Sequence, residues 1–206
     1  MIRIHNASIA YGKEVIFKNL TLHVPPSTIN CITGASGKGK SSLLNAIMGF
    51  TPLNEGSITI NNQLLSKENI HAIRNNIAWL PQEIALPAEW VHEMIGIPFL
   101  LKANQTHPFS KEKLFSYFKM LDLDQSLYEK RVREISGGQR QRIMLSVAAL
   151  LEKKILIVDE PTSALDAASV GKVILFLQHL RDKGVTILAV SHDERFITAC
   201  DHIYTL

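Results

Sequence analysis

The sequence predicts an α/β fold with a mainly parallel sheet, an N-terminal antiparallel β subdomain and an inserted helical subdomain. Residues 155–158 and 185–190 form continuous apolar runs, which are typical of strands buried on both faces of a parallel sheet. In residues 20–24, apolar and polar side chains alternate, which indicates one solvated sheet face and therefore antiparallel pairing. Residues 84–135 are instead rich in aromatic side chains and compatible with helices.

Most of the predicted strands lie in the first half of the chain. The strand-like runs there are residues 2–4, 7–11, 20–24, 29–33, 57–60 and 76–80. Prolines, a glycine and an Asn-Asn pair separate several of these runs and mark turns. We therefore expect one domain over residues 1–206, with the α/β core in residues 1–83 and 136–206 and the helical subdomain between them.

Composition argues against several classes of protein. The formal net charge is +3, and the basic cluster at Lys130, Arg131 and Arg133 is too short to indicate nucleic acid binding. No apolar run approaches the roughly 18 residues of a membrane span, and the first residues alternate like a strand rather than forming a signal peptide. The two cysteines, Cys31 and Cys200, lack the spacing of a zinc site and are expected as buried, reduced thiols. We expect a cytoplasmic protein with no nucleic acid partner.

The glycine-rich stretch at residues 34–42 fits the phosphate-binding pattern of Gly, four residues, then Gly-Lys-Ser. It follows the strand-like residues 29–33 and precedes apolar residues with helical spacing, which is the order that phosphate binding at a helix N-terminus requires. Lys40 is expected to reach the β- and γ-phosphates, and the Ser41 hydroxyl is expected to bind Mg²⁺. The residues of this candidate nucleotide site are Gly34, Ala35, Ser36, Gly37, Lys38, Gly39, Lys40, Ser41 and Ser42.

A second candidate anion site begins at Ser136, Gly137, Gly138 and Gln139, before a helix-like segment at residues 140–151. Taken alone, this sequence is more often a serine N-cap followed by flexible glycines. The sequence thus predicts two helix N-termini that are candidate phosphate-binding sites.

Polar side chains follow both buried strands. Asp159 and Glu160 come directly after residues 155–158, and His192 comes shortly after residues 185–190. Ligands of open α/β sheets bind at the carboxyl ends of parallel strands. We expect Asp159 to hold Mg²⁺ through water and Glu160 to orient or deprotonate an attacking water. A mere capping role for the two acids is disfavoured because burying unpaired charges is costly, whereas a lone histidine is usually structural.

The aromatic residues leave alternatives open. Tyr11 either stacks on an adenine ring or packs at a strand end. Leu114, Phe115, Phe118 and Leu121 recur at helical spacing with Ser110 available as an N-cap, which is typical of a core helix. A further set either belongs to the core or forms a groove for a partner, namely Ile84, Leu86, Trp90, Ile97 and Phe99.

Together, these motifs resemble those of the ATP-binding-cassette (ABC) ATPases over nearly the whole chain. The glycine-rich loop alone would indicate only a P-loop nucleotidase, and the Ser-Gly-Gly-Gln signature at its distance before Asp159 makes the resemblance specific. The matching positions are Tyr11 for the adenine-stacking aromatic, residues 34–42 for Walker A, Gln82 for the Q-loop, Ser136, Gly137, Gly138 and Gln139 for the signature, Asp159 and Glu160 for Walker B, residues 163–166 for the D-loop and His192 for the switch histidine.

The resemblance implies a P-loop NTPase core that binds ATP and Mg²⁺ and hydrolyses ATP. It implies a head-to-tail homodimer or pseudo-dimer, in which each ATP lies between Walker A of one subunit and the signature of the other. Glu160 would polarise the attacking water, His192 would contact the γ-phosphate, and Gln82 would sense Mg²⁺ and link the site to the helical subdomain. Ser41, Gln82 and Asp159 would hold the Mg²⁺.

The resemblance also implies a partner. In transporters, the helical subdomain presents a groove to a helix of the membrane subunit, so this chain would act with a separate permease at the inner face of the cell membrane. The alternative is a non-transport ABC ATPase that acts as a mechanical switch on a membrane or other complex. Two departures stand out: Ile135 replaces the usual leucine before the signature, and the chain stops at residues 203–206, where relatives usually continue with a turn and a helix.

Overall fold

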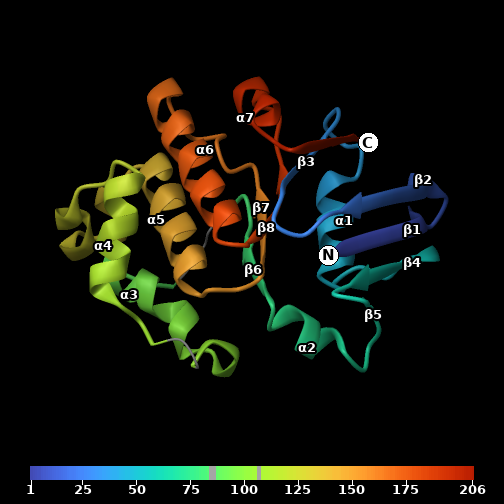
Figure 1. Cartoon of the computed structure of the whole chain (residues 1–206), viewed down its shortest axis with the longest axis horizontal. Helices are drawn as coiled ribbons and strands as arrows, with labels where there is room; N and C mark the ends of the chain where they lie inside the picture. Colours follow the sequence, from blue (N-terminus) through green and yellow to red (C-terminus); the bar gives the residue numbers. More distant parts are fainter. Residues whose placement is uncertain (84–86, 106–107) are drawn as a thin grey trace.

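The computed structural model describes residues 1–83, 87–105 and 108–206. Its strands form a four-stranded antiparallel sheet and a five-stranded parallel sheet, and helices pack on the parallel sheet (Figure 1). This arrangement confirms the predicted α/β fold with its N-terminal antiparallel sheet. Within the described residues, no helix is both long enough and apolar enough to cross a membrane.

The antiparallel sheet comes from the N-terminal third of the chain. In the order β2-β1-β4-β5, its strands are β2 (Glu14–Val24), β1 (Ile2–Tyr11), β4 (Glu55–Ile60) and β5 (Gln63–Leu64). The sequence predicts two strands within residues 2–11, whereas the structure has the single strand β1. The two predicted runs are separated by Asn6, which has a φ of 46°, and the pairing with β2 shifts register there without ending the strand. β2 begins earlier than predicted, since its first half lies at the sheet edge and is largely exposed, which leaves no alternating pattern to read.

The parallel sheet carries the polar residues that the sequence singles out. In the order β6-β7-β8-β3-β9, its strands are β6 (Ile77–Leu80), β7 (Ile155–Asp159), β8 (Thr186–Val190), β3 (Ile29–Thr33) and β9 (His202–Thr205). All residues of β8 and the first four of β7 are buried, as their continuous apolar runs predict. All neighbouring strands are parallel, so the carboxyl ends of β3, β6, β7 and β8 meet at one edge.

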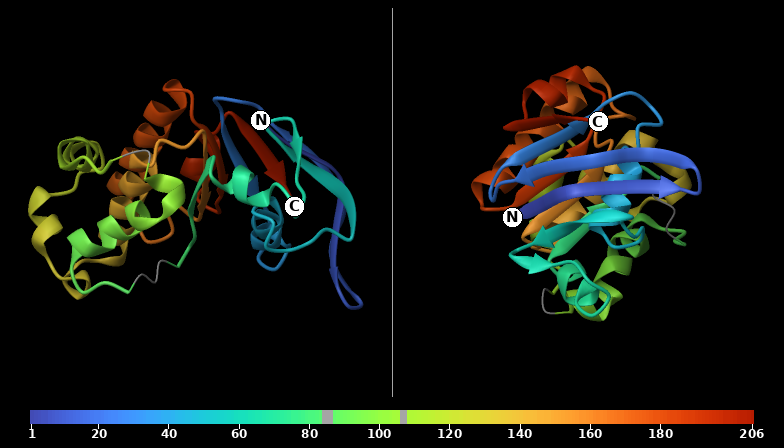
Figure 2. Two further views of the ribbon diagram at one scale, coloured as in Figure 1. Left: turned by 90° about the horizontal axis from the view of Figure 1, so that it is seen from below. Right: turned by 90° about the vertical axis from the view of Figure 1, so that its right-hand side faces the viewer.

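Helices cover both faces of the parallel sheet. The α-helices of the described residues are α1 (Lys40–Ile47), α2 (Ile70–Arg74), α3 (Val91–Gly96), α4 (Lys111–Met120), α5 (Gly137–Leu150), α6 (Ala167–Asp182) and α7 (Glu194–Thr198). α1 lies between the two sheets (Figure 2). Its residues Leu43, Leu44 and Ile47 are fully buried in a core shared by both sheets. α5 and α6 pack on the opposite face in a second core. One parallel sheet therefore serves both cores.

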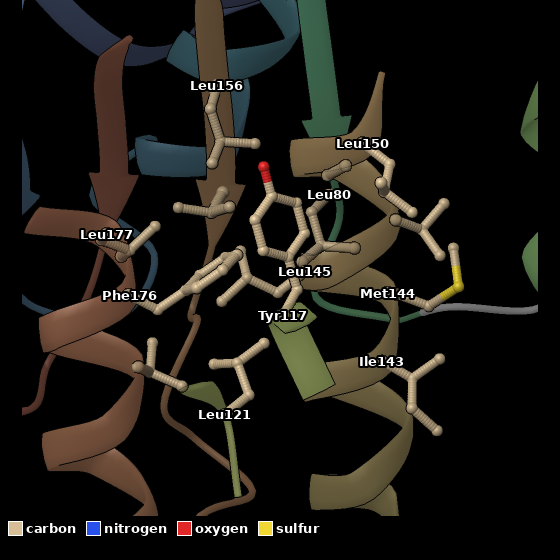
Figure 3. Close-up of a cluster of buried hydrophobic side chains, with 14 of the residues drawn as sticks. Leu80, Tyr117, Leu121, Ile143, Met144, Leu145, Leu150, Leu156, Phe176 and Leu177 are labelled. Atoms are coloured by element: carbon tan, nitrogen blue, oxygen red, sulfur yellow. The ribbon is translucent and has the colours of Figure 1, made fainter. Parts of the chain in front are cut away.

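The helical region between β6 and α5 is fastened to the second core by α4. Ser110 caps this helix as predicted, because its hydroxyl accepts a hydrogen bond of 3.2 Å from the Lys113 backbone N–H. The ring of Tyr117 meets that of Phe176 edge-on at 5.2 Å. Figure 3 shows this cluster, in which the labelled side chains are Leu80, Tyr117, Leu121, Ile143, Met144, Leu145, Leu150, Leu156, Phe176 and Leu177.

The two cysteines, distant in sequence, are neighbours in space. Both are free and close enough to influence each other's pKa, and the Cys200 thiol donates a hydrogen bond of 3.2 Å to the Phe196 oxygen. Cys31 is fully buried, as predicted, but Cys200 is only partly buried because it follows α7 near the surface.

Candidate functional site

A cavity of about 500 Å³ opens at the carboxyl edge of the parallel sheet. The loop after β3 and the residues that follow β6, β7 and β8 converge there, which is where an open α/β sheet binds its ligand. Its lining residues are Ile16, Ser36, Gly37, Gly39, Lys40, Ser41, Ser42, Gln82, Asp159, Glu160, Val190 and His192. The fold thus brings the predicted phosphate loop, both acids, Gln82 and His192 to one place.

The phosphate loop depends on glycines with a left-handed backbone. Gly37 and Gly39 have φ angles of 81° and 87°, which a side chain would strain, and a Cβ on Gly39 would collide with Ile16. Gly39 is also the N-cap of α1, so the helix begins directly from the loop. The Lys40 ammonium donates hydrogen bonds to the backbone oxygens of Gly34 (2.8 Å) and Ala35 (3.0 Å). A buried cation is thereby held against the loop at the start of a helix, which suits an anionic ligand.

Asp159 and Ser41 form the candidate metal site. Burial raises the pKa of the Asp159 carboxyl, while a hydrogen bond with the Ser41 hydroxyl and the charge of Lys40 oppose that rise. A carboxylate and a hydroxyl are oxygen donors of the kind that Mg²⁺ prefers, and Mg²⁺ usually completes its shell with phosphate and water. The donor set therefore fits Mg²⁺ at this place, and a bound cation would offset the cost of the buried carboxylate.

Glu160 faces His192 across the cavity. One Glu160 carboxylate oxygen, Oε1, lies 3.4 Å from His192 Nε2. Burial raises the pKa of Glu160, and the charge of His192 is the main opposing influence. The backbone of Glu160 has a φ of 53°, and its N–H donates to the Val190 oxygen at 2.9 Å. A buried carboxylate whose pKa is raised, next to an imidazole, is suited to orient or deprotonate water.

Of the two remaining residues predicted for the nucleotide site, only one lines the cavity. Gln82 is exposed and lines the cavity, as its predicted role requires. Tyr11 ends β1 with 53% of its surface exposed and is not among the lining residues, so adenine stacking by Tyr11 stays a prediction. Ile16 does line the cavity, although nothing in the sequence singled it out. Ile16 lies on β2, and its side chain packs against Gly39 of the phosphate loop. This contact depends on the tertiary fold, so no local sequence pattern predicts it.

The signature residues lie outside this cavity. Among the described residues, the lining includes none of Ser136, Gly137, Gly138 or Gln139. Ser136 is the N-cap of α5, its hydroxyl accepts from the Gln139 N–H at 3.1 Å, and the Gln139 side chain accepts from the Ser136 N–H at 2.9 Å. Ser136 and Gly137 are exposed, so the amino end of α5 is open to a ligand on the surface. The capping interpretation of this sequence is confirmed, and it leaves the helix start available for an anion.

A second cavity, of about 270 Å³, lies where the helical region meets β6 and α5. Its lining is mainly apolar and includes the exposed residue Leu101. Of the residues predicted for a partner groove, Ile97 lines this cavity, and Trp90 does not; Trp90 instead lies under the guanidinium of Arg131, 4.7 Å from its ring. Ile84 and Leu86 lie outside the described residues.

Comparison with known sequences identifies the family. The model of the ABC transporter family matches residues 17–163. The manganese transport system ATP-binding protein MntB of Listeria innocua is 30% identical over 203 residues, a match that covers 96% of this chain and 82% of the relative. The glutamine transport ATP-binding protein GlnQ of Bacillus subtilis is 29% identical over 199 residues, with 95% and 82% covered.

Solved structures agree with this result. The dimeric structure of MJ0796, a bacterial ABC transporter cassette, matches with a TM-score of 0.87 and 28% identity, and covers 100% of this chain and 94% of that one. A second dimeric structure of the MJ0796 cassette, in a post-hydrolysis state bound to ADP and Pi, matches with a TM-score of 0.85, 26% identity and the same coverage. The chain therefore belongs to the ABC transporter family and is an ATP-binding cassette that hydrolyses ATP.

Proposed function

We propose that this ATPase drives substrate movement through a separate membrane permease, by ATP-dependent dimerisation of two cassettes. One observation carries the proposal: the phosphate loop, Glu160 and His192 line one cavity, whereas Ser136 and Gly137 are exposed outside it. Each chain thus has two incomplete halves of an ATP site. A head-to-tail pair of chains would complete both at once, as each signature helix start supplies N–H groups to the ATP of the other chain.

Within that site, we assign roles by geometry. Residues 34–42 bind the phosphates, with Lys40 as the charged donor. Glu160 orients and deprotonates the attacking water, and His192, 3.4 Å from it, contacts the γ-phosphate. Gln82 and Asp159, with Ser41, hold Mg²⁺, which when bound neutralises charge on the phosphate oxygens. Residues 84–135 form the helical subdomain of this single ATPase domain.

The dimer is tested by Glu160→Gln, which keeps the size of the side chain but removes the base. We expect the variant to bind ATP, to lose about 10²–10³-fold in hydrolysis, and to elute as a stable dimer in size-exclusion chromatography with ATP. The dimer persists because the ATP that joins the two chains is no longer consumed. An unchanged rate of hydrolysis would exclude the role of Glu160, and a monomer saturated with ATP would exclude the dimer.

Lys40→Ala serves as the companion variant. It removes the ammonium that lies against the phosphate loop, so nucleotide binding itself should weaken, with no dimer at any ATP concentration that saturates the wild type. Isothermal titration calorimetry with a non-hydrolysable ATP analogue measures this directly. Together, the two variants separate nucleotide binding from hydrolysis.

The proposed permease partner is a membrane protein whose cytoplasmic helix docks at the cavity of Leu101 and Ile97, which holds the cassette at the inner face of the membrane. Support comes from the apolar lining of this cavity and from relatives named as ATP-binding proteins of transport systems. A mild-detergent pull-down of the tagged chain from its native membranes, followed by mass spectrometry, tests it. A partner with several membrane spans is the expected result, whereas exclusively soluble or ribosomal partners would favour the non-transport alternative.

A further inference from the structure

We propose that Gln141 is a positioning residue for hydrolysis: it fixes the backbone of Glu160 and so ties the signature helix of a chain to the ATP-hydrolysing site of that same chain. The inference rests on the proposed role of Glu160 and adds a residue that lines neither cavity. Gln141 would act through Glu160, without touching ATP.

The contact is short and buried. Gln141 lies in the first turns of α5 with 8% of its surface exposed, and its Nε2 donates a hydrogen bond of 2.6 Å to the backbone oxygen of Glu160. The Ser163 hydroxyl donates to the same oxygen at 3.2 Å. The opposite side of the Glu160 backbone is fixed by its N–H, which donates to the oxygen of Val190. The backbone N–H and the backbone oxygen of Glu160 therefore both form hydrogen bonds with residues outside β7.

The conformation of Glu160 needs such support. Its φ of 53° lies in the left-handed region, which disfavours residues other than glycine. This conformation turns the chain sharply after β7 and leaves the Glu160 carboxylate beside His192 rather than following the strand direction. If the Gln141 hydrogen bond were lost, this carbonyl oxygen would keep only the longer hydrogen bonds from Ser163 among the described residues, so Glu160 would be freer to relax toward an ordinary backbone conformation and move its carboxylate.

Gln141 is poorly suited to a purely stabilising role. Its other amide atom, Oε1, is buried and has no hydrogen-bond partner among the residues that the structure describes. A half-satisfied buried amide destabilises a fold relative to an apolar side chain of similar size. The cost of burying this amide is therefore better explained by a need for its N–H group, which donates to the Glu160 oxygen.

The helix that carries Gln141 begins with the signature residues. Gly138 lies one turn before Gln141, and a Cβ there would approach the backbone oxygen of Ala164 to 2.7 Å, so α5 is in close contact with the segment after Glu160. In the proposed dimer, the exposed Gly137 contacts the ATP of the other chain. A shift of α5 on forming that contact would then reach Glu160 through Gln141, which links the two ATP sites.

Gln141→Met tests the proposal, because methionine keeps the volume but cannot donate. We expect kcat to fall about tenfold or more from the displaced carboxylate, with KM for ATP within about twofold of the wild type. Ser146→Ala is the matched control: Ser146 is buried on the same helix and donates only to the oxygen of Ile143, so kcat should be unchanged.

A double-mutant cycle separates positioning from general damage. If Gln141 acts through the Glu160 carboxylate, adding Gln141→Met to Glu160→Gln should lower the residual hydrolysis no further. The inference would be overturned if the losses of the two single variants multiplied in the double variant, or if Gln141→Met alone had the kcat of the wild type. An inactive Glu160→Gln beside an active Gln141→Met leaves the proposed function standing, whereas an active Glu160→Gln removes the basis of both.

Should Gln141→Met fail to fold, Gln141→Glu gives an independent readout. An ionised carboxylate cannot donate to the Glu160 oxygen, but the protonated acid can. Its kcat relative to the wild type at the same pH should therefore be lower at pH 8 than at pH 6. An equal ratio at both values would count against the hydrogen bond.

Discussion

Asp159 combines a functional requirement with a cost in stability. It ends the buried strand β7, and burial raises the pKa of its carboxyl despite the hydrogen bond with Ser41 and the charge of Lys40. A raised pKa means that the ionised form is less favourable in the folded protein than in the unfolded chain. The charge that makes Asp159 suitable for Mg²⁺ thus destabilises the nucleotide-free fold.

Asp159→Asn should therefore be more stable and less active than the wild type. Because the folded wild type binds this proton more tightly than the unfolded chain does, its free energy of unfolding decreases as pH rises through the two pKa values. Asparagine removes that loss, so at pH 8 we expect a gain of about 0.5–1 kcal/mol, discounted for partial solvation, and a gain of roughly 1–4 °C in melting temperature. The gain should be smaller at pH 5 than at pH 8, because the raised pKa brings protonation of the wild-type carboxyl closer to the lower pH.

Thermal melts of the nucleotide-free protein at the two pH values measure this effect. Asp182→Asn is the control, since Asp182 is exposed at the end of α6 and its replacement should change stability little. Asp159→Asn should also lose most of its Mg²⁺-dependent hydrolysis. A variant that melts lower than the wild type at pH 8 would contradict the claim that the buried charge is a net cost.

At the scale of residues, the sequence predicted those side chains that follow a strong local pattern. Asp159, Glu160 and His192 come after apolar runs whose burial can be read directly, and they line one cavity. Ile16 and Gln141 were missed for a physical reason. Ile16 lies on an exposed edge strand, and the role of Gln141 depends on a hydrogen bond between residues 19 positions apart.

At the scale of elements, α5 makes different contacts through two adjacent glycines. A Cβ on Gly138 would meet the Ala164 oxygen at 2.7 Å and the Leu165 side chain at 2.9 Å, whereas a Cβ on Gly137 would have only Ala164 near it, at 3.9 Å. Gly138 therefore permits close packing of α5 on residues 163–166 of the same chain. Gly137 faces open space, where the proposed partner would lie.

Alanine at these two positions should therefore give opposite results. Gly138→Ala is expected to lower the free energy of unfolding by about 1–3 kcal/mol, because backbone and a buried side chain must move apart. Gly137→Ala should fold with unchanged or slightly higher stability, yet interfere with ATP-dependent dimerisation in the Glu160→Gln background. Chemical denaturation and size-exclusion chromatography measure the two effects. Equal stability of both variants would contradict the close packing at Gly138.

Elements were predicted well where burial gave a clear pattern. The predicted run at residues 29–33 matches β3, and Ser110 caps α4 as expected. The sequence did not predict α2, a helix of five residues with one fully buried side chain, because so short a segment shows no periodicity. The start of β2 was misplaced for the related reason that an edge strand with exposed faces need not alternate.

At the scale of the whole molecule, the parallel sheet separates the nucleotide cavity from the two hydrophobic cores. Its carboxyl edge holds the ATP cavity. One face supports α1 and the antiparallel sheet, and the other supports α5 and the helical region (Figure 2). α5 joins two of these parts, since it starts at the signature, contacts Glu160 through Gln141 and ends beside the apolar cavity of Leu101. The proposed permease site and the ATP site are thus connected by one helix.

Leu101→Glu should uncouple these sites without harming the isolated enzyme. Leu101 is 58% exposed at the apolar cavity, so a glutamate there should alter stability by less than about 0.5 kcal/mol but oppose docking of an apolar helix. Leu64→Glu is the matched control, because Leu64 is also 58% exposed but lies on β5 of the antiparallel sheet. We expect both variants to hydrolyse ATP like the wild type in solution, and Leu101→Glu alone to lose the membrane partner in a pull-down. Loss of the partner in both variants, or in neither, would place the docking surface elsewhere.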